Sequence, residues 1–129
     1  MSEKFQLEII SPEKTLLNIE TKQVSIPAYE GAMTILKDHI SLITFLRPGL
    51  IEVDLPNGLE KFYAEDGTVE FFQNKLLILS SSVINKKNLT NEQISVMIED
   101  TKNKINSSDL NDKEKYILSY KENTLETII

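Results

Sequence analysis

The sequence predicts an N-terminal antiparallel β-sandwich, or flattened barrel, followed by a C-terminal antiparallel hairpin of two helices. All 4 Gly and all 4 Pro lie in the first 67 of the 129 residues, between short runs rich in β-branched and aromatic side chains. This is the pattern of strands joined by turns. Residues 88–129 contain no Gly or Pro and carry apolar residues at helical spacing. We therefore expect a sandwich at 1–84, a hinge at 85–89 and a helical hairpin at 90–129.

The strands are predicted from alternation and from apolar runs. Residues 5–9 and 51–55 alternate apolar and polar side chains, as half-buried strands do. Residues 76–79 are continuously apolar, which predicts a strand buried on both faces. Further strands are expected at 24–26, 33–35, 42–46, 61–64 and 68–72. Short strands at this spacing favour a sandwich or flattened barrel.

Turn residues separate these strands. They are Pro27, Pro48, Gly49, Asn57, Gly58, Asp66 and Gly67. Asn57-Gly58 predicts a hairpin with a type I′ turn, because that turn needs positive φ at both central residues. Asp66-Gly67 predicts a second hairpin of the same kind, between 61–64 and 68–72.

The C-terminal part has a clear helix start. Thr90 and Gln93 fit a capping box, with Leu89 and Ile94 placed as a hydrophobic staple. An apolar stripe follows at Ile94, Met97, Ile98, Thr101 and Ile105. The polar stretch 106–109 breaks the pattern and is expected to cap a second helix. That helix offers Leu110, Ile117, Leu118, Leu125 and Ile128, with Tyr116 and Tyr120 on its flanks.

Composition excludes several functions. The net charge of −6 argues against nucleic acid, which is bound by basic surfaces. With 0 Cys and 1 His, we expect no metal site and no cofactor. Residues 1–5 contain no secretory h-region, and no apolar run approaches the ~20 residues of a membrane span. Any membrane association is therefore expected to be peripheral.

Catalytic signals are weak. Asp38-His39 is an adjacent acid and base, but no nucleophile is identifiable beside it. Neither standard phosphate-binding glycine motif is present. We favour a structural or interface role for His39 and a non-catalytic protein. A small enzyme using Asp38 and His39 is the weaker alternative, and a stand-alone β-sandwich binding module with a helical tail is the other.

Several motifs in order over residues 5–79 resemble the ε subunit of the F-type ATP synthase. Residues 24–31, VSIPAYEG, are similar to that family's IPG-x-EG turn, and 33–42, MTILKDHISL, to its GIL-x-x-HAPL segment. Residues 46–51, LRPGLI, are similar to its LKPG-x-I, and 65–70 stand where it has GG-hydrophobic-x-E. Ala32 departs from the second Glu that the family carries after the Glu-Gly pair, and the helices are Lys-, Asn- and Glu-rich where the family's are Ala- and Arg-rich.

The resemblance implies a non-catalytic rotor subunit that couples proton-driven c-ring rotation to ATP synthesis. It implies the γ subunit and the c-ring as partners, with the α/β catalytic head a further candidate through the hairpin. The turn Glu30, Gly31, Ala32 and Met33, with the nearby His39, is expected at the rotor interface. The implied place is the cytoplasmic face of a bacterial coupling membrane, favoured over a plastid thylakoid. Because residues 88–129 contain no Arg, we expect no ATP binding there and at most weak regulation by the hairpin.

Overall fold

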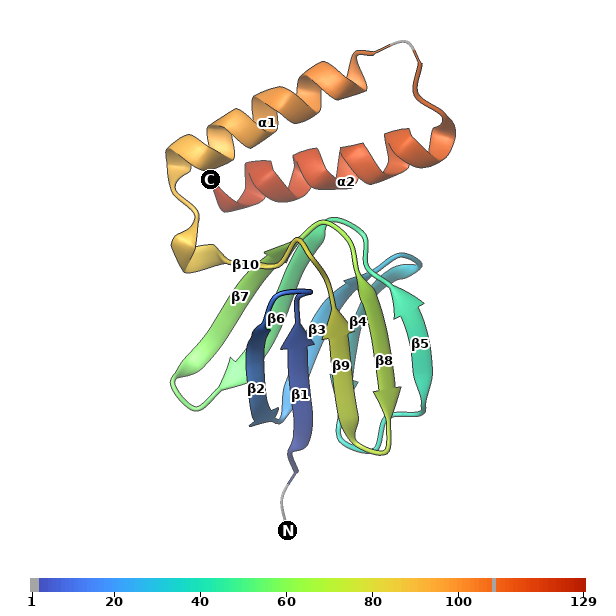
Figure 1. Cartoon of the computed structure of the whole chain (residues 1–129), viewed down its shortest axis with the longest axis vertical. Helices are drawn as coiled ribbons and strands as arrows, with labels where there is room; N and C mark the ends of the chain where they lie inside the picture. Colours follow the sequence, from blue (N-terminus) through green and yellow to red (C-terminus); the bar gives the residue numbers. More distant parts are fainter. Residues whose placement is uncertain (1–2, 108) are drawn as a thin grey trace.

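The computed structural model describes residues 3–107 and 109–129, which form two facing sheets and a helical hairpin lying across one end of them (Figure 1). The strands are β1 (Phe5–Ile10), β2 (Thr15–Thr21), β3 (Gln23–Ala28), β4 (Gly31–Leu36), β5 (Leu42–Phe45), β6 (Gly49–Leu55), β7 (Gly58–Ala64), β8 (Thr68–Phe72), β9 (Lys75–Leu79) and β10 (Ile84–Asn85). A 3₁₀ turn η1 (Lys86–Asn88) leads to the helices α1 (Asn91–Ile105) and α2 (Asp112–Ile128). A sandwich followed by two helices is the predicted fold.

Each sheet has five strands. Sheet A has the order β2-β1-β9-β8-β5, and sheet B the order β10-β7-β6-β3-β4. The pairs are antiparallel except β1 with β9, which run parallel. The parallel pair brings the first strand against the last long one, so residues 5–10 depend on a partner about seventy residues away.

The core lies between the sheets and is built from alternate residues of the strands. Its fully buried members include Leu7, Ile9, Ile26, Ile51 and Ile78. Phe5 and Phe71 meet edge to face with ring centroids 5.7 Å apart. Burying each such side chain stabilises the fold by about 1.5–3 kcal/mol, so the alternation along the strands is what selects their faces.

Two strands were not predicted, the two-residue β10 and the longer β2. β2 pairs antiparallel with β1 at the edge of sheet A. Its residues do not alternate cleanly, because Leu16 and Leu17 are both half-buried. Its register shifts between Ile9 and Ile10, so a period-two pattern is interrupted and gives little signal.

The predicted type I′ turn at Asn57-Gly58 is wrong. Leu55 pairs with Gly58, so the turn residues are Pro56 and Asn57. Pro56 cannot adopt positive φ because its ring fixes that angle. Among Pro56, Asn57 and Gly58, only Gly58 has a positive φ, at 120°. The paired positive φ values occur instead between β8 and β9, at Gln73 (48°) and Asn74 (60°).

The predicted hairpin at Asp66-Gly67 is also wrong. These residues join β7 of sheet B to β8 of sheet A, so the chain crosses between sheets there. Gly67 has φ +148°, and a Cβ on it would lie 2.7 Å from the Leu79 carbonyl oxygen. The glycine is needed for close approach to β9, which local sequence cannot reveal.

β9 is buried on one face, not on both as expected. Leu76 and Ile78 are in the core, whereas Leu77 is half-buried and Leu79 is 44% exposed. Sheet A carries no helix on its outer surface in the described part of the chain, since the hairpin lies across the end of the sandwich (Figure 1).

The helical hairpin follows the prediction at its start. Thr90 and Gln93 form the capping box of α1. The second helix is capped by Asn111, not by 106–109, and Leu110 precedes it. Ser108, within the predicted cap, lies outside the described residues. The division at 84/85 and 89/90 stays a prediction; η1 lies in the stretch assigned to the hinge, and β10 spans the 84/85 division.

Candidate functional site

The outer surface of sheet A carries several exposed apolar side chains beside polar ones, among them the ion pair of Lys75 and Glu8 at 3.4 Å. Ile43 and Phe45 on β5 are 77% and 60% exposed, and Phe72 on β8 is 56% exposed. They share one side with the outward residues of β9, because Phe45 and Leu79 both pair with Thr68, and Ile43 and Leu77 both pair with Glu70. We call these residues the apolar face: Ile10, Ile43, Phe45, Phe72, Leu77 and Leu79.

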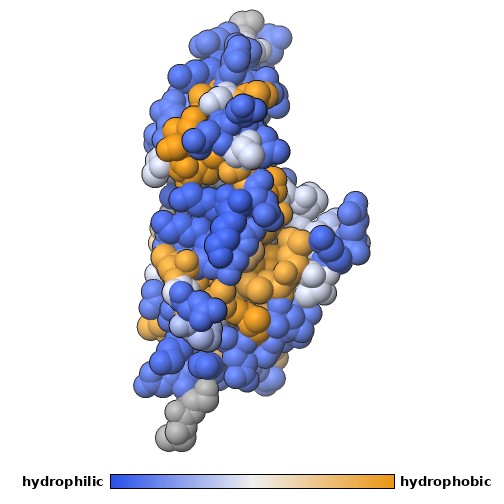
Figure 2. Space-filling model, turned by 90° about the vertical axis from the view of Figure 1, so that its left-hand side faces the viewer, coloured by the Kyte–Doolittle hydropathy of each residue, from blue (hydrophilic) through white to orange (hydrophobic). Residues whose placement is uncertain are grey.

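The outer surface of sheet B is different. Its central strands present polar pairs, such as Lys61 with Glu52 at 3.8 Å and Ser25 with Thr34 at 3.0 Å. Its exposed leucines, Leu36 and Leu59, are on β4 and β7, with β6 and β3 between them. Exposed apolar surface of this kind marks a site for a partner, and on sheet A the apolar residues of β5 and β9 lie on either side of Thr68 and Glu70 of β8. Figure 2 shows one further side of the molecule, where a polar belt separates apolar surface on the sandwich from that on the hairpin.

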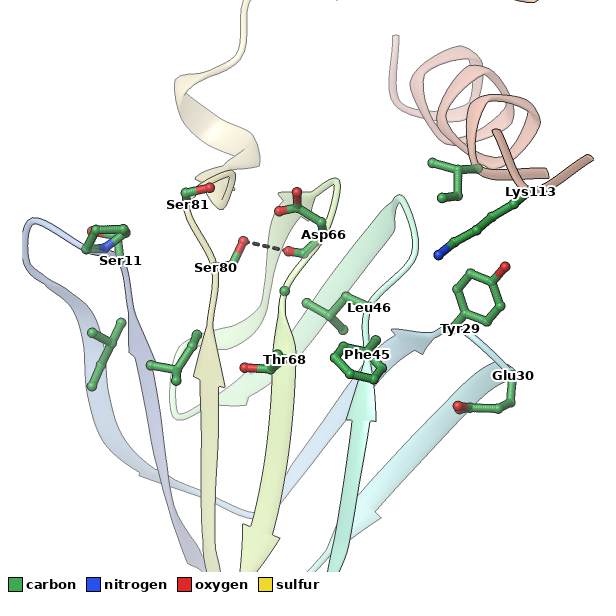
Figure 3. Close-up of a pocket in the computed structure, with 15 residues that line it drawn as sticks. Ser11, Tyr29, Glu30, Phe45, Leu46, Asp66, Thr68, Ser80, Ser81 and Lys113 are labelled. Carbon is green, nitrogen blue, oxygen red and sulfur yellow. Dashed lines mark hydrogen bonds between the residues drawn. The ribbon is translucent and has the colours of Figure 1, made fainter. Parts of the chain in front are cut away.

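A groove of about 950 Å³ continues the apolar face towards the hairpin (Figure 3). Phe45, Leu46 and Leu79 line it from the sandwich, and Lys113 and Ile117 line it from α2. Figure 3 shows Lys113 extending from α2 above Tyr29. Acidic side chains at Glu30 and Asp66 also line the groove. Its lining therefore combines apolar side chains with the negative charges of these two residues and the positive charge of Lys113.

The predicted interface turn joins β3 to β4 beside this groove. Glu30 is exposed at the tip, and its two carboxylate oxygens lie 2.9 and 2.7 Å from the hydroxyl of Thr44, which donates to them. Gly31 has φ +149°, Ala32 is exposed and Met33 is half-buried against the core. Thr44 therefore holds the Glu30 carboxylate at the corner between the sheets.

His39 is not near this turn. It follows β4 at the opposite end of the sandwich, where its ring meets Phe71 with centroids 5.8 Å apart. Its Nδ1 lies 2.7 Å from the Ile40 carbonyl, which can only accept, so Nδ1 carries the proton. Asp38 binds Asn74 instead of His39. The expected cluster of Glu30 and His39 is thus divided by the length of β4.

The predicted turn residues have local structural roles. Gly49 begins β6 against Pro27, whose Cβ would lie 2.5 Å from a Cβ added to the glycine. Pro48 is buried and its carbonyl faces Thr124 of α2, with the hydroxyl 3.5 Å away. These residues bring the connection between β5 and β6 close to the hairpin.

The contacts that attach the hairpin to the sandwich were not predicted from the sequence. Arg47 donates from a guanidinium nitrogen to the Tyr116 hydroxyl at 3.0 Å, and its Cζ lies 3.8 Å from the centroid of the Tyr120 ring. The available signals were that Arg47 is the single arginine and that the tyrosines are four apart, on one helix face.

A second attachment involves Tyr63, which is 1% exposed in a cluster with Ile94, Leu125 and Ile128. Its hydroxyl donates to Glu65 at 3.1 Å, and Glu65 forms an ion pair with Lys121 at 2.8 Å. Burial raises the pKa of the Tyr63 hydroxyl, and the charge and hydrogen bond of Glu65 raise it further. Tyr63 thus stays neutral beneath the hairpin.

The described residues contain neither a candidate membrane-spanning helix nor a candidate metal site. None of their helices is both long and apolar enough to span a bilayer. Nor do residues 3–107 and 109–129 bring three or more His, Cys, Asp or Glu together in a group able to hold a metal ion.

Comparison with known proteins connects this architecture to one family. The model of the "ATP synthase, Delta/Epsilon chain, beta-sandwich domain" matches residues 4–86, more than half of the chain. An ATP synthase epsilon chain of Pelagibacter ubique is 43% identical over 129 residues, covering 99% of both chains. Another, of Nitratiruptor, is 33% identical over 107 residues, with 82% of this chain and 83% of the relative covered.

Solved structures share the fold. A chain from the mitochondrial ATP synthase of Euglena gracilis, in an OSCP/F1/c-ring structure, gives a TM-score of 0.80 at 17% identity. The match covers 98% of this chain and 82% of that chain. A chain from the central stalk and c-ring of the Tetrahymena thermophila enzyme gives 0.61 at 14% identity, covering 98% and 95%. At these identities the likeness concerns the fold.

Together these findings define a class, the non-catalytic β-sandwich subunits of ATP synthase complexes. The chain belongs to the ATP synthase delta/epsilon chain family, and the relatives described above carry the name ATP synthase epsilon chain. Membership supports the subunit reading over the stand-alone binding module and over an enzyme built on Asp38 and His39.

Proposed function

We propose that this chain sits in the central stalk, on the cytoplasmic face of a coupling membrane, and links c-ring rotation to ATP synthesis through the γ subunit. The observation that carries the proposal is the apolar face, which leaves Ile43 and Phe45 more than half exposed on an ordered sheet. A subunit that transmits torque needs a rigid body and a broad contact, and a two-sheet core supplies the rigidity.

The γ subunit is assigned to the apolar face. Burying an exposed Phe or Ile stabilises an interface by about 25 cal/mol per Å² of apolar surface removed from water. The polar outer surface of sheet B, with its Lys61–Glu52 and Ser25–Thr34 pairs, offers no comparable gain. The stalk is therefore expected along β5, β8 and β9.

The c-ring is assigned to the turn at Glu30, Gly31, Ala32 and Met33. The support is the motif that these residues share with the family, together with the exposed Glu30 and Ala32 at the tip. Since His39 is at the other end of β4, it is assigned no ring contact. It lies instead below β8, close to Phe71.

The assembly test uses substitutions matched for exposure. Phe72→Asp on the apolar face should abolish co-purification of a tagged chain with the ATP synthase. Leu59→Asp, at a position 55% exposed on sheet B against 56% for Phe72, should leave co-purification intact. Equal retention of both variants would contradict the assignment of γ to the apolar face.

The ring contact has its own test. Single cysteines at Glu30 and at His39 are clean probes because the chain contains 0 Cys. In the assembled enzyme the cysteine at Glu30 should crosslink to a cysteine in the polar loop of the c subunit, and the one at His39 should not. Crosslinking from position 39 alone would reverse the orientation.

A further inference from the structure

The N-terminal half of α2 is attached to the sandwich in an unusual way. Lys113 and Ile117 line the open groove, so this half of the helix has space beneath it where a packed helix would have side chains. The C-terminal half differs, since Leu125 is fully buried and Ile128 is 9% exposed in the cluster around Tyr63.

What holds the N-terminal half is a set of rings around one guanidinium. The Tyr116 hydroxyl accepts from Arg47 at 3.0 Å and donates to the Tyr29 carbonyl at 2.8 Å. The Tyr116 ring contacts Tyr29 on one side and Tyr120 on the other, with centroids 5.1 and 4.8 Å apart. Arg47 also covers the Tyr120 ring, so a single side chain engages both tyrosines of α2.

The backbone of Arg47 is fixed independently of this contact. Its N–H donates to the Pro27 carbonyl at 2.9 Å, next to the bridge between Ala28 and Leu46. A substitution that removes the guanidinium therefore leaves the backbone hydrogen bond and the corner of the sandwich in place. The side chain is free to serve the hairpin alone.

We propose that Arg47 is a latch that holds the N-terminal half of α2 over the groove, and that releasing it opens the groove without unfolding the sandwich. A planar guanidinium stacks on one ring while donating to another group, which an ammonium does not match. The N-terminal half of α2 has fewer buried side chains than the C-terminal half, and segments with few buried contacts are the ones that open locally. Arg47 therefore controls whether α2 covers the end of the apolar face nearest the hairpin or leaves it accessible to a partner.

Amide hydrogen exchange on the full chain tests the latch. Arg47→Ala should raise exchange of the amides at 116–121 about tenfold, the loss expected for a partly desolvated cation–π contact and its hydrogen bond. Arg47→Lys should behave nearly as Ala does, and Tyr116→Phe, which keeps the ring, should give a smaller increase. Amides of β9 and of 125–128 should keep their protection.

A matched control is Lys102→Ala, which removes the exposed pair of Lys102 and Glu126 between the two helices at 3.5 Å. It should leave exchange at 116–121 unchanged. Spin labels on cysteines placed at Ser81 and Lys113, both lining the groove, should report a broader and longer distance distribution in Arg47→Ala than in the parent.

Three results would overturn the latch. Unchanged exchange at 116–121 in a folded Arg47→Ala chain would show that the contact holds nothing. If Arg47→Ala also lowered the protection of the β9 amides, and Tyr116→Phe lowered it equally, Arg47 would contribute to the stability of the whole fold and would not act as a latch. An equal rise over 116–128 would mean that α2 is released as a whole.

Discussion

Lys121 of α2 and Glu65, just beyond β7, form an ion pair of 2.8 Å that joins the hairpin to the sandwich. Its side chains are 17% and 34% exposed, whereas Lys102 and Glu126, at 3.5 Å, are 54% and 45% exposed. Both are lysine–glutamate pairs. They differ in solvent exposure, and the first joins the hairpin to the sandwich whereas the second joins the two helices.

Lys121→Met should therefore lower the free energy of unfolding by about 1 kcal/mol, at the upper end for partly sheltered pairs. Lys102→Met should change it by at most about 0.3 kcal/mol, as exposed pairs do. Urea unfolding of both variants measures the difference. Equal effects would indicate that the shelter around Glu65 does not strengthen its pair.

Tyr63 should make stability fall at high pH. Its pKa in the folded chain is raised by burial above the unfolded value of about 10. The stabilisation is fully present below pH 10 and is lost as pH rises further, because the unfolded chain then binds fewer protons than the folded one. The slope from this group is about −1.4 kcal/mol per pH unit.

Tyr63→Phe removes that group while keeping the ring. Urea unfolding between neutral pH and pH 11 should show a shallower decline for the variant than for the parent. The other tyrosines and the lysines are common to both chains, so their titration cancels to first order. Parallel pH profiles would contradict the role assigned to Tyr63.

Gly31 and Gly67 allow the cost of backbone strain to be separated from the cost of a steric clash. Their φ values are +149° and +148°, but a Cβ at Gly31 meets nothing within 4 Å, whereas one at Gly67 lies 2.7 Å from the Leu79 carbonyl oxygen. Gly31→Ala should cost about 1–2 kcal/mol from backbone strain. Gly67→Ala should cost at least about 2 kcal/mol more, because β9 must shift. Thermal unfolding distinguishes the two, and equal costs would show that β9 yields freely.

Truncation after Lys87 should leave a folded sandwich that still assembles, because the core between the sheets contains no residue of α1 or α2. It removes the cluster that covers Tyr63. The pKa of Tyr63 should then return towards its ordinary range, measured by the absorbance of tyrosinate. Loss of β structure, or of co-purification with the ATP synthase, would contradict the prediction.

Some features could be predicted from local sequence patterns, and others could not. The capping box of Thr90 and Gln93 was predicted correctly because its two reciprocal hydrogen bonds lie within four residues. The apolar face was not predicted from the sequence. Residues 76–79 form one apolar run, and such a run does not show whether one face of the strand is buried or both. The separation of Glu30 and His39 was not predicted either, although the strand expected between them implies it, because an extended strand rises about 3.3 Å per residue.

The sequence by itself determined the order of eight of the strands and of both helices, since alternation, turn residues and helix caps act over a few neighbouring positions. The boundary predicted near residues 85–90 rests on signals of the same local kind, the helix start at Thr90 and the lack of Gly and Pro in residues 88–129. Only the tertiary structure decided that Asp66-Gly67 crosses between sheets, that β1 lies parallel to β9, and that Arg47 holds a tyrosine 69 residues away. These contacts arise when distant segments bury their apolar faces together, and neither partner carries a local mark of the other.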